Sequence, residues 1–325
     1  LKTEQIDYVI TVKKQNNYNK LFKYGVTSSI EEVKECAGSA YYPVELSEVM
    51  KYVIENKGKY AVVGLPCFIK SVELAKKKNK LIKERIIYTI GLVCNHLKSK
   101  YYTSYLAYKS GITEKLKSVN FRHKIKDSVI NNYKFCAINQ NGDKKYLSFS
   151  NGISEMWKNG YFKINACNYC DDIFAECADI VFMDAWLKEY YDSLGTNLVI
   201  TRNKDLYLLI RQISEHIPIK KIVKSQKDLI YNKRSFISEK SKNIPNNIKS
   251  LRTNLEINNS TYSIVKTIEN LKMIYLNIQN TKIKRITNNS KNRLKRVDFI
   301  ILKTRFITKI INKVLKLFNL IKDCK

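Results

Sequence analysis

The sequence predicts an α/β fold with some α+β character: a mixed sheet with a strand-helix-strand core, an inserted hairpin region and a basic helical C-terminal extension. Short apolar runs alternate with stretches of helical periodicity over residues 6–93, which is typical of parallel strands joined by helices. An Asn141-Gly142 turn signal separates two further strand-like runs. From residue 241 the chain becomes strongly basic, and its last part has helical periodicity.

The first part of the chain carries the strand-helix-strand core. The predicted elements are strands at 6–12, 60–63 and 86–93 and helices at 44–56 and 68–78. This order implies parallel pairing with a right-handed crossover. Ligands of such sheets collect beyond the carboxyl ends of the strands, and Cys67 and Cys94 both follow those ends.

The middle of the chain changes character from about residue 121. Two strands are expected at 133–138 and 145–149, joined as a hairpin by the Asn141-Gly142 turn. Two later apolar runs, at 178–183 and 197–201, would return the chain to the main sheet.

The C-terminal part differs from the rest in charge and composition. Residues 241–325 hold 19 Lys and Arg against 4 Asp and Glu, a net charge of 19 − 4 = +15. An Asn-rich linker is expected at 243–259, and a long amphipathic helix at 294–321. We therefore divide the chain into a domain over 1–240 and a basic helical region over 241–325.

The predicted C-terminal helix has two possible uses. Its apolar residues recur at helical spacing, while Arg305, Lys309, Lys313 and Lys316 gather on another face. A basic amphipathic helix can lie on an anionic membrane surface or dock a partner protein. The alternative is that the apolar stripe packs on the protein's own core.

Bulk composition describes a globular protein. The chain has 325 residues and a mass of 38.0 kDa, with 44% hydrophobic and 27% charged residues, which suits one large or two ordinary domains. The net charge of +30 would suit an anionic partner. Zinc-finger spacing, RNA-recognition signatures and groove-binding basic helices are all missing from the sequence, so we expect no specific nucleic acid.

Five cysteines outline the strongest chemical signal. Cys167, Cys170 and Cys177 lie within eleven residues, and Cys67 and Cys94 each close an apolar run. Thiolates are the soft ligands that select iron–sulfur clusters and zinc. Structural zinc sites normally use a second close ligand pair, which the sequence does not offer, so the spacing favours a cluster over zinc.

The other cysteines and the compartment follow from the same reasoning. Cys36 and Cys136 are expected to be ordinary buried thiols, and Cys324 a tail residue. Eight cysteines in 325 residues are too sparse for a disulfide scaffold, which favours the reducing cytoplasm. The basic C-terminal helix adds a peripheral position at the inner face of the membrane as an expectation. The chain begins with Leu1, carries no signal-peptide pattern, and is expected to lack an N-terminal part.

Several short motifs occur along the chain in a characteristic order. They are Gly64-Leu65-Pro66-Cys67, Val93-Cys94-Asn95-His96 with Ser99, Phe121-Arg122-His123-Lys124, Ala166-Cys167 to Cys170, Ala178-Asp179-Ile180 and Asp184-Ala185-Trp186. In this order and spacing they resemble the beta subunit of coenzyme F-420-reducing hydrogenases and dehydrogenases. The resemblance covers about residues 5–235, and its motifs are jointly specific although each alone is weak.

The resemblance implies an iron–sulfur flavoprotein with a 4Fe-4S cluster and FAD. Such a protein passes electrons between the cluster and a small organic hydride acceptor or donor, and it works with an electron-donor protein or ferredoxin-like module. Bacterial relatives also occur among proteins of surface-polysaccharide synthesis. The chain departs from the family pattern at Leu65, Asn95 and Met183, and the family's upstream ferredoxin-like and flavin-binding segments are not found.

The cysteines are the expected metal ligands. Cys67, Cys167 and Cys170 are the leading ligands of the cluster, and Cys94 and Cys177 compete for the fourth position. Four thiolates are enough for one cluster.

Arg122 and Lys124 are candidates for binding a cofactor phosphate or an acidic substrate, because guanidinium groups bind phosphate through two parallel hydrogen bonds. The alternative is a solvated surface pair.

Four further residues complete the candidate site. His96 and His123 could deliver a proton, given an ordinary pKa near ~6.5, although a single histidine is more often structural. Asp184 and Trp186 could contact a flavin or order the cluster loop, and Trp186 could equally be a core aromatic residue.

The cysteine pattern and the family resemblance together imply electron transfer by an iron–sulfur oxidoreductase, with the flavin implied by the resemblance. The alternative is a non-catalytic or zinc-stabilised scaffold or partner protein with the same fold in a polysaccharide pathway. Iron and zinc content would separate the two.

Overall fold

The computed structural model describes residues 1–125 except 16 and 18, residues 132–185 except 169, residues 195–213, four short pairs between 271 and 283, and residues 291–323. The predicted linker at 243–259, the proposed boundary at residue 240, Trp186 and Cys324 lie outside these residues. The division into two domains therefore stays a prediction.

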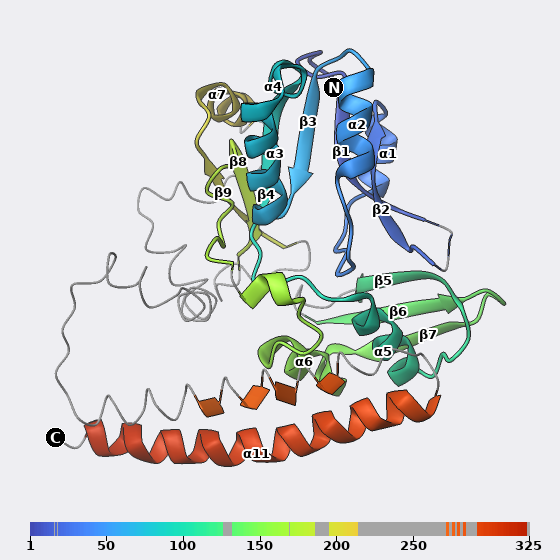
Figure 1. Ribbon diagram of the computed structural model, residues 1–325, viewed down its shortest axis with the longest axis vertical. Helices are drawn as coiled ribbons and strands as arrows, with labels where there is room; N and C mark the ends of the chain where they lie inside the picture. Colours follow the sequence, from blue (N-terminus) through green and yellow to red (C-terminus); the bar gives the residue numbers. More distant parts are fainter. Residues whose placement is uncertain are drawn as a thin grey trace.

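A six-stranded mixed sheet forms the upper layer of the molecule (Figure 1). Its strands follow the order β2-β1-β3-β4-β8-β9. They are β1 (Tyr8–Lys14), β2 (Phe22–Thr27), β3 (Tyr60–Gly64), β4 (Ile86–Leu92), β8 (Ile180–Asp184) and β9 (Asn197–Thr201). The four central strands are parallel, and the edge strands β2 and β9 are antiparallel to their neighbours. The predicted mixed sheet and its parallel core are confirmed.

Three helices pack against this sheet through the apolar residues of their inner faces. They are α2 (Ser47–Glu55), α3 (Pro66–Lys78) and α4 (Lys80–Arg85). Val53, Ile69 and Ile82, one from each helix, join a single hydrophobic core with the sheet. α3 starts directly after β3 because Pro66, which lacks a backbone donor, suits the first turn of a helix.

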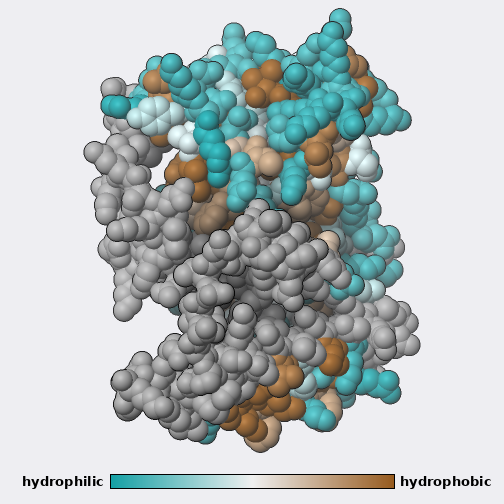
Figure 2. All heavy atoms as spheres, turned by 60° about the vertical axis from the view of Figure 1, so that its left-hand side comes forward, coloured by the Kyte–Doolittle hydropathy of each residue, from teal (hydrophilic) through white to brown (hydrophobic). Residues whose placement is uncertain are grey.

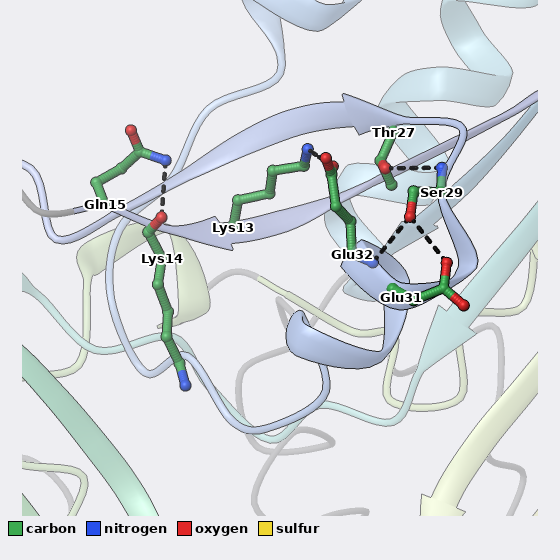
Figure 3. A network of polar contacts seen from close by, with 7 residues as sticks. All are labelled: Lys13, Lys14, Gln15, Thr27, Ser29, Glu31 and Glu32. Carbon is green, nitrogen blue, oxygen red and sulfur yellow. Dashed lines mark hydrogen bonds and ion pairs between the residues drawn. The ribbon is translucent and has the colours of Figure 1, made fainter.

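A polar cap fixes the start of α1 (Ile30–Glu35) beside β1 and β2 (Figure 3). The Ser29 hydroxyl accepts a hydrogen bond from Glu32 N at 3.3 Å, and Ser29 N donates to Thr27 Oγ1 at 3.2 Å. Lys13 Nζ lies 2.7 Å from Glu32 Oε2, which ties the helix to β1. Serine in this position satisfies a backbone donor that the helix itself leaves open.

The lower layer contains a three-stranded antiparallel sheet and the helices that cover it (Figure 1). The elements are β5 (Leu116–Lys124), β6 (Tyr133–Asn139), β7 (Lys144–Ser148), α5 (Lys100–Ser110) and α6 (Ser154–Lys158). The predicted hairpin is confirmed as β6 and β7, and Gly142 in its turn has a φ of 93°. β5 adds a third strand on the other side of β6.

Helix α11 (Lys291–Asp323) runs along the lower edge of the molecule, next to α5 and α6 (Figure 1). Leu294, Val297 and Ile301 belong to the same hydrophobic core as α5 and the three-stranded sheet. Asp298 accepts a hydrogen bond from Tyr105 at 2.6 Å and pairs with Lys109 at 3.1 Å. The predicted C-terminal helix is confirmed, and one of its faces packs on the protein's own core.

A membrane-spanning helix needs about 20 consecutive and mainly apolar residues. None of the helices within the described residues combines that length with that apolar character.

Candidate functional site

Cys67 and Cys94 lie at the same edge of the parallel sheet. β3 and β4 pair in parallel with Gly64 opposite Gly91, and each cysteine comes three residues after one of these glycines. Cys67 is exposed in the first turn of α3, where the open backbone donors of the helix favour a negative group. The strand order predicted from the sequence therefore brings these two thiols to one edge.

The turn after β4 connects Cys94 with the second group of cysteines. Cys94 N donates to Ile173 O at 3.1 Å, and Leu97 N donates to Cys167 Sγ at 3.2 Å. Ile164 N donates in turn to Leu97 O at 3.1 Å. The residues on both sides of the Cys167–Cys170 pair are thus attached to the turn that begins at Cys94.

Cys170 continues this arrangement. Its Sγ donates to Asp172 O at 3.4 Å, one residue before the Ile173 carbonyl that binds Cys94. Backbone N–H groups that donate to cysteine sulfurs, as Leu97 N does to Cys167, tune the potential of an iron–sulfur cluster. Cys94, Cys167 and Cys170 therefore belong to one structural unit.

Cys177 lies farther along the loop, away from this unit. After Ile173 the chain crosses β4 towards the start of that strand, because Asp179 N donates to Thr89 O at 3.1 Å. The stretch from Thr89 to Cys94 corresponds to about 16 Å of extended chain. Cys177 precedes Asp179 by two residues and is exposed, between Ala175 and Ala178, which pack on β4 at Gly91.

The crossing is close because β4 has a glycine where the loop passes. A Cβ on Gly91 would lie 2.5 Å from Ala175 Cβ and 3.0 Å from Ala178 Cβ. Only glycine leaves room for a backbone to approach this closely.

Asp179 and Arg202 hold the crossing loop in place. Asp179 Oδ2 accepts hydrogen bonds from Thr89 N at 2.8 Å and Thr89 Oγ1 at 2.9 Å, and its Oδ1 accepts one from Asn203 Nδ2 at 3.2 Å. Arg202 donates from Nη1 to Ala175 O and Ala178 O, both at 3.2 Å. The Ala-Asp-Ile motif of the sequence thus has a structural role.

Arg122 and Asp184 meet between the two sheets. Arg122 Nη1, from β5, lies 2.9 Å from Asp184 Oδ2 at the carboxyl end of β8. The guanidinium also lies over the ring of Tyr133, 5.0 Å from its centroid. Burial disfavours the charged form of Arg122, but the neighbouring Tyr41 and Asp184 outweigh that effect and raise its pKa. Arg122 therefore keeps its positive charge next to the carboxyl end of β8.

The remaining predicted residues lie apart from this ion pair. Lys124 is exposed at the end of β5, and Trp186 lies outside the described residues. His96 is buried with its ring 4.7 Å from that of Trp157, whereas His123 lies against Tyr146 at 5.2 Å. The two histidines therefore occupy different surroundings, one enclosed by α6 and one on the three-stranded sheet.

Lys98 is a functional candidate that the sequence did not reveal. It is fully buried, and its Nζ donates to Tyr161 O at 2.6 Å and Met156 O at 3.1 Å. The ammonium lies 4.6 Å from the centroid of the Trp157 ring. Lysine is seldom fully buried, so only its place two residues after the Cys-Asn-His motif could have drawn attention to it.

The thiols at the strand ends do not form a compact metal site among the described residues. Among the described residues, no three His, Cys, Asp or Glu side chains come together closely enough to hold a single metal ion.

Met183 explains one departure from the family pattern. It is buried at 4% exposure beside Ala185 and Leu198. Its side chain fills space that a glycine would leave open near the end of β8. The ion pair between Arg122 and Asp184 and the contact with Tyr133 do not by themselves indicate a flavin site.

Comparisons with known proteins agree with this architecture. In a structural comparison the chain resembles a chain of the F420-reducing [NiFe] hydrogenase complex from Methanosarcina barkeri, solved after xenon derivatization. The TM-score is 0.51 with 17% sequence identity over 73% of this chain and 78% of that chain, a likeness that shows the fold alone. A comparison with curated proteins found no match.

Sequence models of one protein family match the larger part of the chain. The model for the C terminus of the coenzyme F420 hydrogenase/dehydrogenase beta subunit matches residues 57–225, which is more than half of the chain. The model for the N-terminal part of the same protein matches residues 1–51. The resemblance inferred from the motifs is confirmed, and the chain belongs to the coenzyme F420 hydrogenase/dehydrogenase beta-subunit family.

Proposed function

We propose that this chain is an electron-transfer oxidoreductase that holds a 4Fe-4S cluster through Cys67, Cys94, Cys167 and Cys170. The observation that supports it is the turn after β4, which starts at Cys94 and donates a backbone N–H to Cys167 Sγ. Membership of a hydrogenase/dehydrogenase family supports redox chemistry. When bound, the cluster would supply one-electron transfer, and the protein would supply its position and electrostatics.

The fourth ligand in this proposal is Cys94 rather than Cys177. The loop that carries Cys177 runs away from the turn after β4, as the Asp179–Thr89 contact requires. Both thiols are chemically equivalent as ligands, so our choice of Cys94 as the fourth ligand depends only on where the two residues lie along the loop and the turn.

A small organic acceptor or donor would bind near Arg122, where the strand ends of the main sheet face β5. Arg122 keeps its charge there and can attract an acidic group of the substrate, while Asp184 holds the guanidinium in place. We keep FAD as a further proposed cofactor that carries hydride between this substrate and the cluster. In this proposal the chain works in the cytoplasm in surface-polysaccharide metabolism. It receives its electrons from a separate electron-donor protein.

The test is metal and flavin analysis of protein purified without oxygen. Wild type is compared with four single variants, Cys67→Ser, Cys94→Ser, Cys167→Ser and Cys170→Ser. Cys177→Ser serves as the matched control. We expect about four irons and four sulfides per chain in the wild type and the control, and loss of iron in the four ligand variants.

The outcomes separate the parts of the proposal. If Cys94→Ser kept its iron and Cys177→Ser lost it, the fourth ligand would be Cys177 and not Cys94. Zinc in place of iron in the wild type would overturn electron transfer and favour the scaffold alternative. Flavin released on denaturation, in equal amount to the protein, would support FAD, and its absence from anaerobic protein supplied with FAD would exclude it.

A further inference from the structure

Helix α11 carries a second apolar stripe on the side opposite its core contacts. The helix advances 100° per residue, which brings residues at spacings of three and four onto one face. The exposed fractions of these side chains are large. We call this set the outer stripe: Phe299 (68%), Leu302 (57%), Phe306 (68%) and Ile310 (49%).

Positive charge surrounds the outer stripe. The exposed basic residues next to it are Lys295, Arg296, Lys303, Lys309 and Lys313. The helix has two acidic residues: Asp298 is bound to Tyr105 and Lys109, and Asp323 is the last residue of the helix. The outer side of the helix therefore combines apolar side chains with cations.

A hollow beside the outer stripe has the same combination of residues. Its lining includes Tyr275, Lys282, Phe299 and Lys303. Figure 2 shows hydrophobic side chains along the lower edge of the molecule, over α11, with hydrophilic side chains next to them. Aromatic rings next to lysines suit a binding surface that has an apolar layer beside an anionic one, such as a bilayer with anionic headgroups.

The position of the lysines favours a lipid surface over a protein partner. Lys295 and Lys313 share the angular position of the outer stripe, since 295, 302, 306 and 313 differ by steps of seven, four and seven. The centre of a stable protein interface is depleted of lysine. At a bilayer, by contrast, lysine side chains extend to the headgroups while their neighbours enter the apolar boundary.

We propose that the outer stripe of α11 binds the surface of an anionic membrane, with the helix lying parallel to the bilayer. Phe299 and Phe306 would enter the boundary between headgroups and acyl chains, and the flanking lysines would contact lipid phosphates. The opposite face keeps the helix attached to α5, so the whole chain follows the helix to the membrane. This proposal does not depend on the cluster.

The experiment measures sedimentation of the full chain with vesicles. Neutral phosphatidylcholine vesicles are compared with vesicles containing phosphatidylglycerol, at low and high salt. The apolar variant is Phe299→Ser with Phe306→Ser, and its matched control is Leu74→Ser, an exposed leucine (55%) on α3. Circular dichroism confirms that each variant is folded.

A charge variant completes the design. Lys303→Gln, Lys309→Gln and Lys313→Gln are combined and compared with Lys77→Gln, Lys78→Gln and Lys83→Gln, which remove three exposed lysines from α3 and α4. Each lysine lost from α11 should weaken binding to anionic vesicles by about fivefold at low salt. The control set should retain most of the binding.

The expected result is binding to anionic vesicles that falls at least tenfold in the apolar variant and decreases with salt. Equal binding to neutral vesicles, or unchanged binding of the apolar variant, would overturn the proposal. A dimer that dissociates in Phe299→Ser with Phe306→Ser, without vesicle binding by the wild type, would also overturn it and assign the stripe to contacts between copies.

Discussion

Replacing Asp179 by alanine should strongly destabilise the main sheet. Its carboxylate accepts hydrogen bonds from Thr89 N, Thr89 Oγ1 and Asn203 Nδ2, at 2.8, 2.9 and 3.2 Å. Thr89 is fully buried in β4, so water cannot easily replace the lost acceptor. The variant would leave two buried donors on a central strand without their partner.

The size of the effect follows from these contacts. A hydrogen bond to a charged group contributes about 1.5–3 kcal/mol, and a buried donor left unsatisfied costs about 1–3 kcal/mol. Because the two Thr89 bonds dominate, we expect a loss of about 3–5 kcal/mol in the free energy of unfolding. At about 2–4 °C per kcal/mol, the melting temperature should fall by on the order of 10 °C.

Urea denaturation followed by circular dichroism measures the loss. Asp179→Asn keeps the shape of the side chain and one acceptor oxygen. Its free energy of unfolding should therefore fall by less than half as much as that of Asp179→Ala. Asp171→Ala, at an exposed position in the same loop, is the control and should change the free energy by less than about 0.5 kcal/mol. If Asp179→Ala were as stable as Asp171→Ala, the carboxylate would not fix the loop.

Two further changes test the packing around the loop and the chemistry of a buried thiol. Gly91→Ala should destabilise the fold by about 1–3 kcal/mol, because the new Cβ would lie 2.5 Å from Ala175 Cβ, and an unchanged urea midpoint would contradict the close crossing. Burial raises the pKa of Cys136 in β6, so iodoacetamide at neutral pH should modify exposed Cys177 of the metal-free protein first and Cys136 only after unfolding. Peptide mass spectrometry measures both rates, and equal rates in the folded protein would contradict this reasoning.

The sequence predicted the parallel core and the hairpin because their local signals agree with the tertiary structure. Two other elements carried weaker signals. β2 contains Gly25, where a Cβ would lie 2.8 Å from the Lys13 side chain of the neighbouring strand. α5 lies between the three-stranded sheet and α11, so it is buried on more than one side and loses the apolar periodicity of a surface helix.

The candidate site could be predicted only in part. The cysteine spacing indicated a thiolate site, and strand order placed Cys67 and Cys94 together. The choice between Cys94 and Cys177 depends on the direction in which the loop crosses β4, which is set by the contacts of Asp179 and by the space above Gly91. Asp179 and Thr89 are 90 positions apart in the chain, and local patterns do not report such contacts.

Several protein contacts hold the turn between Cys94 and Ser99. Its backbone binds Ile173, Ile164 and Phe162, and the ammonium of Lys98 is enclosed by two carbonyls and an aromatic ring. In zinc fingers, by comparison, metal binding and folding are one event. Here the contacts of the turn come from its backbone and from Lys98, so exchanging one thiol for a serine hydroxyl should leave the surrounding fold intact.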